Sequence, residues 1–275
     1  MPELPEVETI CRTLNHLVKG KTINGVKVLW PKIIKKPDDV KQFQFLLQGQ
    51  TIQDIQRRGK FIKFVLNDYI LVSHLRMEGR YGLYRKEENY DKHTHVFFYF
   101  TDGTELRYRD VRKFGTMHLF DKGCEEKELP LAQLGVEPFS ELFTVEYLQK
   151  NLKNTDRKIK VVLLDQKIVV GLGNIYVDEA LFRSKIHPLR PAKTLTKNEL
   201  IELRREIVNT LCEAVEKGGS TIRSYVNTQG EMGMFQLRLY VYGRNGDVCK
   251  NCGSIIEKMI VGGRGTHFCP NCQRV

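Results

Sequence analysis

The chain has 275 residues, which is enough for one large domain or two ordinary ones, each with a sizeable core. Its 44 Lys and Arg residues against 33 Asp and Glu give a net charge of +11 and a pI near 9.3, which favours a polyanionic partner such as DNA, RNA or an acidic membrane surface. No apolar run approaches the roughly 20 residues of a membrane helix, and Glu3, Glu6 and Glu8 stand where a signal peptide would be basic, so we expect a soluble, intracellular protein.

The first predicted element is a helix near the N-terminus. Its apolar stripe is closed by Gly20 and consists of Val7, Ile10, Cys11, Leu14, Leu17 and Val18. From Thr22 to Phe120 the pattern changes to short strands, among them 61–66, 69–74, 96–100 and 105–108. The turn Thr101-Asp102-Gly103-Thr104 predicts that the last two strands form a hairpin. This part of the chain is therefore predicted to be a β-rich domain, either a sandwich or barrel-like.

The second half of the chain is predicted to be helical. The strand pattern stops around residues 130–140, and residues 145–164 and 175–182 have the pattern of helices. The clearest helix begins at a capping box, Thr196 with Glu199, and ends at Gly218-Gly219. The sequence contains no internal repeat and no low-complexity tract, so neither a solenoid nor a long disordered arm is implied.

The C-terminal cysteines have the spacing of a zinc site. Cys249-Lys-Asn-Cys252 is followed, after sixteen residues, by Cys269-Pro-Asn-Cys272. Two such pairs are typical of one tetrahedral Zn²⁺ held by four thiolates, and four protein ligands leave no open position, which indicates a structural site. Two disulfides or four free thiols are the alternatives, and an intracellular setting disfavours the disulfides.

The N-terminus suggests covalent chemistry. Methionine aminopeptidase generally removes Met1 before a small residue, which leaves Pro2 with a free secondary amine. An α-amino group has a pKa of about 7.7 to 8.0 against about 10.4 for Lys, so more of it is unprotonated and nucleophilic at neutral pH. Attack on an anomeric carbon of a sugar would expel a base, and Glu3 beside it could move protons. An ordinary processed terminus, with Pro5 in the first turn of the helix, is the alternative.

Three motifs together resemble the formamidopyrimidine-DNA glycosylase family. They are Pro2-Glu3-Leu4-Pro5-Glu6-Val7-Glu8-Thr9, Gly171-Leu172-Gly173-Asn174-Ile175-Tyr176 and the C-terminal cysteine pairs. The resemblance spans essentially the whole chain. It implies a multidomain α+β fold: an N-terminal β-sandwich with an N-terminal helix (1–130), a linker (131–141), a helix-two-turn-helix domain with a lesion-recognition loop (142–235) and a four-cysteine zinc-finger β-hairpin (236–275).

The resemblance also implies an activity in base-excision repair. The family excises oxidised purines, 8-oxoguanine and formamidopyrimidines, from duplex DNA and then nicks the abasic site by β,δ-elimination. Pro2 would be the Schiff-base nucleophile, Glu3 the proton donor and Glu6 a supporting residue. Lys60 matches the family lysine of β-elimination, although a solvated lysine at a strand end is its ordinary reading. Arg264 matches the finger arginine of δ-elimination.

Further residues are placed near DNA by the resemblance. Met77, Arg112 and Phe114 would fill the space that an extruded nucleotide leaves, with Arg112 facing the orphaned cytosine, although a Met and a Phe are more often core residues. The other expected DNA contacts are His74, His93, Lys160, Asn174, Tyr242 and Arg264. Asn174 opens a helix, where backbone N–H groups favour a phosphate. The predicted lesion loop contains Ser220, Thr221, Arg223, Ser224 and Tyr225.

The expected partners are damaged double-stranded DNA and one structural Zn²⁺ per chain. No membrane is expected, and no nucleotide cofactor, because Gly171-Leu172-Gly173 lacks the acidic residue about 20 positions later that a dinucleotide site requires. A monomer in a bacterial cytoplasm, associated with the nucleoid, is expected by family analogy.

Three alternative functions stay open. A sister glycosylase for oxidised pyrimidines shares the fold, but it typically begins Pro-Glu-Gly-Pro and lacks the Met/Arg/Phe wedge, so Leu4, Met77 and Phe114 favour the purine enzyme. A non-catalytic zinc-ribbon nucleic-acid binder would bind without turnover. A basic membrane-surface or structural protein would leave Pro2-Glu3 and the cysteine pairs without a purpose.

Overall fold

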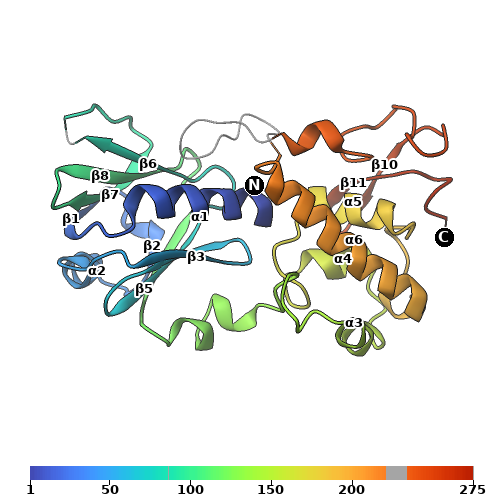
Figure 1. Ribbon diagram of the computed structural model, residues 1–275, viewed down its shortest axis with the longest axis horizontal. Helices are drawn as coiled ribbons and strands as arrows, with labels where there is room; N and C mark the ends of the chain where they lie inside the picture. Colours follow the sequence, from blue (N-terminus) through green and yellow to red (C-terminus); the bar gives the residue numbers. More distant parts are fainter. Residues whose placement is uncertain (86, 221–233, 275) are drawn as a thin grey trace. The chain divides into compact units, whose positions relative to one another are not determined.

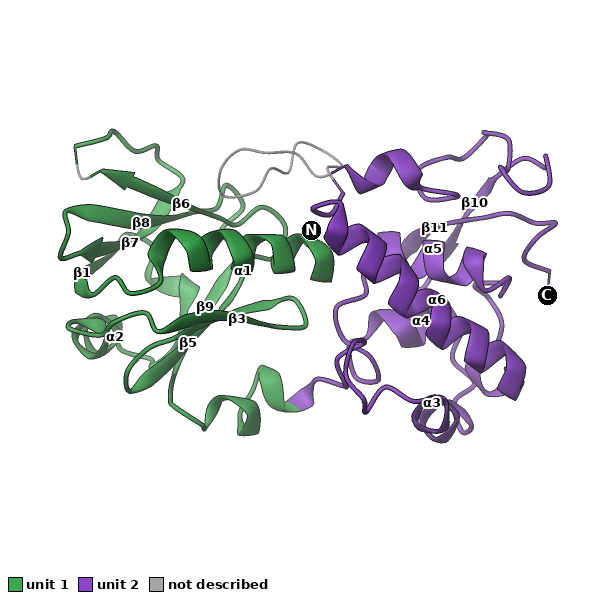
Figure 2. Cartoon of the chain, viewed as in Figure 1, with its two compact units in different colours: residues 1–132, 221–233 green, residues 133–220, 234–275 purple. Residues whose placement is uncertain are grey.

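The computed structural model describes residues 1–85, 87–220 and 234–274 (Figure 1). Figure 2 shows that they form two compact units. Unit 1 comprises residues 1–132, and unit 2 comprises residues 133–220 and 234–274 among those described. The predicted helical and zinc-finger segments therefore lie within one compact unit, and the finer division at residues 130, 141 and 235 stays a prediction.

Unit 1 contains two β-sheets with a shared core, so of the two predicted architectures it is the sandwich. The four-stranded sheet is antiparallel and has the order β1 (Ile23–Val28), β7 (Thr94–Phe100), β8 (Thr104–Arg109), β6 (Arg80–Arg85). The five-stranded sheet has the order β2 (Ile34–Lys36), β9 (Thr116–Asp121), β5 (Tyr69–His74), β4 (Phe61–Val65), β3 (Asp54–Arg58), and only the β2–β9 pair is parallel. The predicted hairpin at residues 96–108 is confirmed as β7–β8.

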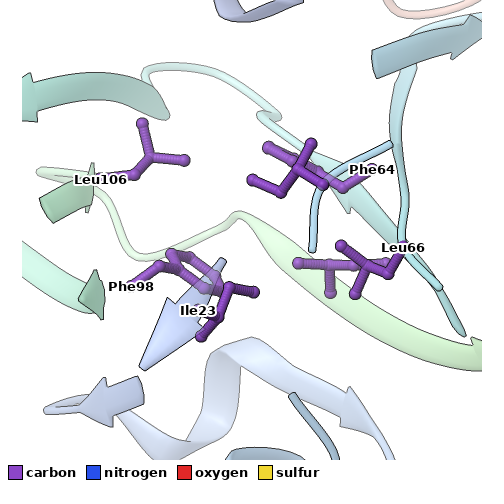
Figure 3. A pocket seen from close by; sticks show the side chains of 7 residues that line it. Ile23, Phe64, Leu66, Phe98 and Leu106 are labelled. Carbon is purple, nitrogen blue, oxygen red and sulfur yellow. The ribbon is translucent and has the colours of Figure 1, made fainter. Parts of the chain in front are cut away.

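Apolar side chains from both sheets meet in one core, which explains the hydrophobic runs of the strands. The core encloses a small pocket of about 10 Å³, lined only by apolar residues of both layers, five of which are labelled in Figure 3: Ile23, Phe64, Leu66, Phe98 and Leu106. A pocket of this size holds one water at most, and it offers that water no polar partner. It is a packing defect of the core, so the functional groups of unit 1 must lie elsewhere.

The predicted N-terminal helix is confirmed as α1 (Leu4–Val18). Its buried residues recur at helical spacing and join the sandwich core, where α1 packs on β3 and β4 (Figure 1). Gly20 has a φ of 83°, a left-handed conformation that glycine adopts without strain, and the chain reverses there. Burial of Val7, Ile10 and Leu14 stabilises the unit by about 1.5–3 kcal/mol each relative to exposed side chains. The shorter helix α2 (Val40–Leu47), which the strand pattern did not predict, packs on β1 and β2.

Unit 2 contains four helices among the described residues, and the predicted helical half is confirmed. They are α3 (Val145–Leu152), α4 (Ile159–Leu164), α5 (Asn174–Arg183) and α6 (Lys197–Glu216). The capping box of Thr196 and Glu199 starts α6, and Gly218 follows its end with a φ of 70°. The cysteine-rich end adds the hairpin β10 (Glu257–Val261) and β11 (Arg264–Phe268). Short 3-10 turns complete the two units: η1 (Pro31–Ile33), η2 (Glu125–Lys127), η3 (Leu131–Gln133), η4 (Ala192–Thr194) and η5 (Phe235–Arg238).

Candidate functional site

The first group of candidate residues lies at the N-terminal end of α1, where Pro2 and Glu3 are buried. Glu3 is the N-cap of the helix: its side chain accepts the backbone N–H of Glu6, and its own N–H donates to Glu6 Oε2 at 2.8 Å. This reciprocal capping box satisfies two N–H groups that a helix start leaves unpaired. It also holds two carboxylates within one helical turn of Pro2, which is the arrangement that proton transfer beside a nucleophile needs.

The turn that contains Lys60 is tied to the first turns of α1. Gly59 and Lys60 connect β3 to β4, and Gly59 has a left-handed φ of 56°. Arg57 Nε pairs with Glu8 Oε2 of α1 at 2.9 Å, and Arg57 Nη1 donates to the carbonyl of Gly59 at 3.1 Å. One arginine thus links the helix that begins after Pro2 to the turn of Lys60.

His74 lies next to this turn, because the register of the sheet pairs it with Phe61, and their rings meet edge-on with centroids 4.5 Å apart. Burial, together with the positive charges of Arg76 and Lys60, lowers the pKa of His74 to about 3. The ring is therefore neutral at pH 7. Because its Nδ1 accepts the backbone N–H of Arg76 at 2.9 Å, the proton is assigned to Nε2, which leaves Nε2 as a hydrogen-bond donor.

The predicted wedge residues lie on two loops at the same end of the five-stranded sheet. Met77 follows β5, whereas Arg112 and Phe114 precede β9, and these strands pair His74 with Thr116. Met77 is 38% exposed and Phe114 51% exposed, so neither of them is part of the sandwich core. The guanidinium of Arg112 lies 4.7 Å from the centroid of the Phe114 ring.

Asp110 organises the second loop and was missed by the sequence analysis. Its carboxylate accepts the backbone N–H groups of Arg112, Phe114 and Gly115 at 3.0, 2.9 and 2.8 Å. Its own N–H donates to the carbonyl of His93, which brings that half-exposed histidine beside the loop. An aspartate that binds backbone groups a few residues later is a known turn signal and could have identified this residue.

The four predicted zinc ligands come together in unit 2. The Sγ atoms of Cys249, Cys252, Cys269 and Cys272 all lie within 4.8 Å of one another, and none of the seven cysteines forms a disulfide. Tetrahedral zinc with Zn–S distances of about 2.3 Å sets its sulfurs about 3.8 Å apart, so the cluster fits the ion. The buried side chain of Gln273, which the sequence analysis did not single out, accepts the N–H of Cys269 and donates to the carbonyl of Ile186.

Arg264 stands at the tip of the β10–β11 hairpin and is exposed. The two-residue turn before it is Gly262-Gly263, and both glycines have a positive φ, as this tight turn requires. The carbonyl of Gly265 accepts hydrogen bonds from Asn174 Nδ2 at 2.8 Å and Lys160 Nζ at 3.3 Å. The predicted residues Asn174 and Lys160 therefore hold the strand that presents Arg264.

Lys160 does not fit the predicted direct contact with DNA. Its side chain is 0% exposed, and its Nζ pairs with Asp178 Oδ1 at 2.6 Å, so the ammonium cannot reach a phosphate in this structure. The other oxygen of Asp178 accepts the N–H of His267 on β11 at 2.9 Å. A charge inside a protein requires a partner, and Asp178 is the partner of Lys160. Together they support the hairpin from the interior.

Tyr242 is half-buried, and its ring meets that of His267 edge-on, with centroids 4.9 Å apart. The carboxylate of Glu179 accepts three successive backbone N–H groups at 2.9 Å, those of Tyr240, Val241 and Tyr242. Burial nevertheless raises the pKa of Glu179. Glu179 thus anchors the segment that leads into the cysteine cluster, and the sequence analysis did not assign it this role.

The predicted lesion loop is described only at its first residue. Ser220 is buried and forms an isolated β-bridge with Met234. The other predicted residues, Thr221, Arg223, Ser224 and Tyr225, lie outside the described part of the chain.

Comparison with known proteins identifies one family for the first two segments and, for the third, a zinc finger that this family shares with IleRS. Residues 1–117 match the formamidopyrimidine-DNA glycosylase N-terminal domain, residues 134–226 its H2TH domain, and residues 246–275 the zinc finger found in FPG and IleRS. The formamidopyrimidine-DNA glycosylase of Cytobacillus firmus is 67% identical over 99% of this chain and 100% of its own length.

Solved structures from Lactococcus lactis agree with the family match. A single-residue mutant of its FPG, in complex with DNA containing Fapy-dG, superposes with a TM-score of 0.94 at 40% identity and full coverage of both chains. Its Fpg in complex with DNA containing an abasic site has a TM-score of 0.93 at 40% identity and covers 99% of this chain and 100% of that one.

Proposed function

This chain belongs to the formamidopyrimidine-DNA glycosylase family, and we propose that it excises oxidised purines from duplex DNA and then cleaves the abasic strand with Pro2 as the nucleophile. The observation that most supports this assignment is the arrangement at the start of α1. Pro2 precedes a capping box of two carboxylates, and an arginine ties the same helix to the turn of Lys60. A nucleophile, an acid and a cation for phosphate are the groups that the reaction requires.

The reaction begins at the secondary amine that Pro2 exposes when Met1 is removed. The amine attacks C1′ of the damaged nucleotide, the bond from C1′ to the base breaks, and the base leaves with the electron pair and takes up a proton. Glu3 supplies a proton to the opening sugar, and Glu6 keeps Glu3 in place through the capping box. The resulting iminium acidifies the protons at C2′. Loss of one of them expels the 3′ phosphate, which is β-elimination.

Cations assist the departure of phosphate. Lys60 is proposed to contact the phosphate that leaves in β-elimination, and His74, neutral with Nε2–H as a donor, can bind a phosphate oxygen without adding charge. Arg264 at the hairpin tip is proposed to assist δ-elimination of the 5′ phosphate. Two eliminations leave a one-nucleotide gap.

Extraction of the damaged nucleotide is assigned to the wedge. Met77 and Phe114 are proposed to enter the base stack, and Arg112 to bind the orphaned cytosine, because unstacking costs a few kcal/mol that new contacts must offset. His93, Asn174 and Tyr242 are proposed to contact the DNA backbone. Ser220 and residues 221–225 are proposed to cover the extruded base.

One structural Zn²⁺ is held by Cys249, Cys252, Cys269 and Cys272, consistent with the zinc-finger match. Zinc with four thiolate ligands supplies folding energy rather than a reactive water. It stabilises the segment that presents Arg264. Its contribution to the reaction is therefore proposed to be positional.

The expected partner is damaged duplex DNA, bound by a monomer with no nucleotide cofactor. The net charge of +11 agrees with a polyanionic partner. A substrate on the bacterial chromosome predicts a location in the cytoplasm, next to the nucleoid. In the structure, no helix within the described residues is long and apolar enough to cross a membrane.

Borohydride trapping on a duplex with 8-oxoguanine opposite cytosine tests the proposal. We expect a covalent adduct on Pro2, located by mass spectrometry of the N-terminal peptide, and no such adduct with Pro2→Gly. Mass spectrometry of the free protein must first show that Met1 is absent. Binding without an adduct from correctly processed protein would favour a non-catalytic DNA binder, and a preference for oxidised thymine would favour the sister glycosylase.

A further inference from the structure

The two loops that contain the wedge residues each end in a glycine. The first runs from the end of β5 to Gly79 and contains Met77, whereas the second connects β8 to β9, ends in Gly115 and contains Arg112 and Phe114. Neither Gly79 nor Gly115 has a positive φ. A residue with a side chain could therefore adopt both backbone conformations, and the reason for glycine must be steric.

The steric reason shared by both positions is the end of the Tyr108 side chain. A Cβ built at Gly79 or at Gly115 would overlap the side-chain oxygen of Tyr108. At Gly79 the backbone oxygen of Leu75, 2.7 Å from such a Cβ, adds a second overlap. Tyr108 is a β8 residue, and it is completely buried. Its hydroxyl lies against the backbone of both loops at once, so the two loops are packed on a common atom even though they are more than 30 residues apart in the sequence.

The second loop is also fixed from within by Asp110, which is buried. One carboxylate accepts the backbone N–H groups of Arg112, Phe114 and Gly115, and the Tyr108 hydroxyl lies 3.5 Å from Asp110 Oδ2, within range to donate to it. These bonds stabilise a strained conformation, because Lys113 has a φ of 58°, in the left-handed region that a non-glycine residue rarely adopts. The carboxylate therefore determines the path of the loop between Arg112 and Phe114.

The outer side of the loop is held by a cation–π contact. The Nζ atom of Lys113 lies 4.1 Å from the ring centroid of Trp30, the single tryptophan of the chain. The loop backbone is thus fixed on the inside by Asp110 and on the outside by Trp30. Its wedge side chains nevertheless stay exposed, as side chains that enter the base stack of DNA must be.

We propose that Tyr108 and Asp110 form a buried anchor that holds the Met77 loop and the Arg112–Phe114 loop at one fixed separation, so that the three side chains enter the base stack as a rigid unit. The inference rests on the proposed function, since it takes the wedge as given. Tyr108 and Asp110 are positioning residues and touch no DNA. A loop that is ordered in advance loses less conformational entropy at the moment of binding.

The test compares Tyr108→Phe and Asp110→Asn with a matched control, Tyr81→Phe. Tyr81 is also buried, its ring lies 5.1 Å from that of Tyr108, and its hydroxyl donates to Ser73 Oγ at 2.7 Å instead of packing on the loops. The signal is the fluorescence of 2-aminopurine placed beside an 8-oxoguanine in the duplex, which rises when the stack opens. The second readout is single-turnover excision of 8-oxoguanine from the same duplex.

We expect Tyr108→Phe to slow stack opening and excision together by about 3- to 10-fold, the worth of one hydrogen bond. Asp110→Asn replaces an acceptor by a donor that faces backbone N–H groups, and displacement of the loop should slow both by about 100-fold. Tyr81→Phe should match the wild type. Cleavage of a single-stranded abasic oligonucleotide, which has no stack to open, should change less than about 2-fold in every variant, because neither the hydroxyl of Tyr108 nor the carboxylate of Asp110 belongs to the reacting groups.

A double-mutant cycle of Gly115→Ala and Tyr108→Phe tests the proposal even if Asp110→Asn misfolds. Gly115→Ala should be strongly harmful in the wild type and partly less harmful in the Tyr108→Phe background, because the severe overlap of 1.7 Å with the hydroxyl oxygen is gone and the milder one of 2.8 Å with Cζ stays. If the wild type opens no stack and forms no adduct, the proposed function itself fails. If the wild type is active while Tyr108→Phe and Asp110→Asn behave like Tyr81→Phe, or if single-stranded cleavage falls as much as excision, the anchor is refuted.

Discussion

Lys160 and Asp178 form an ion pair of 2.6 Å between Nζ and Oδ1 in which both side chains are 0% exposed. Each partner also binds β11: Lys160 donates to the carbonyl of Gly265, and Asp178 accepts the N–H of His267. The pair therefore connects α4 and α5 to the strand that begins with Arg264.

Loss of one charge from this pair should destabilise unit 2 strongly. Asp178→Asn removes the negative charge beside a buried ammonium, which is expected to lower the free energy of unfolding by about 3–5 kcal/mol. Urea denaturation followed by circular dichroism measures the change. Removal of both charges in Lys160→Met/Asp178→Asn should recover most of the loss.

An exposed pair of the same length serves as the control. Lys193 and Asp156 are also 2.6 Å apart, but their side chains are 45% and 79% exposed. Asp156→Asn should therefore cost less than about 1 kcal/mol. A similar cost for the two aspartate variants would show that burial is not what makes the Lys160–Asp178 pair important.

Glu3→Gln should separate the chemistry of Glu3 from its structural role. A glutamine oxygen can still accept the N–H of Glu6, so stability should change by less than about 0.5 kcal/mol. Loss of the carboxylic acid should slow single-turnover base excision by about 100- to 10,000-fold. Glu3→Ala should show the same rate loss and a further cost of about 1 kcal/mol in stability, because it also removes the cap. Wild-type excision by Glu3→Gln would exclude a proton-transfer role.

His74 should make folding sensitive to acid. Its folded pKa is about 3, whereas an unfolded histidine titrates near about 6.5, so between these values the unfolded chain binds one more proton. The stability that neutral His74 contributes to the folded state is complete above pH 6.5. It falls by about 1.4 kcal/mol per pH unit as the pH decreases toward 3. The pKa of His118 is lowered to about 4, so this residue also makes the stability fall with decreasing pH. Its contribution is the same in the wild type and in a variant of His74.

The comparison is with His74→Asn, which keeps an acceptor for the N–H of Arg76 and does not titrate. The stability advantage of the wild type over this variant should shrink between pH 6.5 and 4.5 in urea denaturation. A difference that does not depend on pH would mean that folding does not lower the pKa of His74.

Removal of a zinc ligand should weaken DNA binding through the fold of the finger. Cys252→Ser is expected to lose the metal and the order of the β10–β11 hairpin, and with it the placement of Arg264. The zinc content and the affinity for an 8-oxoguanine duplex should fall together. Cys212→Ser, which changes an exposed cysteine of α6 outside the cluster, is the matched control. Unchanged affinity in zinc-free Cys252→Ser would contradict this role of the finger.

Features with local signals could be predicted from the sequence. The cysteine pairs, the capping box at Thr196 and Glu199, and the hairpin turn at Asp102-Gly103 each depend on residues a few positions apart, and all are present in the structure. The stripe of α1 is also local, because the period of the helix determines which residues face the core. The chemistry of the N-terminus first suggested the roles of Pro2 and Glu3, and the family resemblance supplied those of the wedge residues; all of these roles stay proposals.

By itself, the sequence determined many of the helices and strands, the metal ligands and the chemical character of the N-terminus. Only the tertiary structure decided that Lys160 is an interior support, that Asp110 gathers three N–H groups, and that the Tyr108 side chain overlaps any Cβ at Gly79 and Gly115. The physical reason is the range of the interactions. Burial, ion pairing and steric exclusion join residues from separate strands and helices, and no spacing along the chain reports which of them will touch.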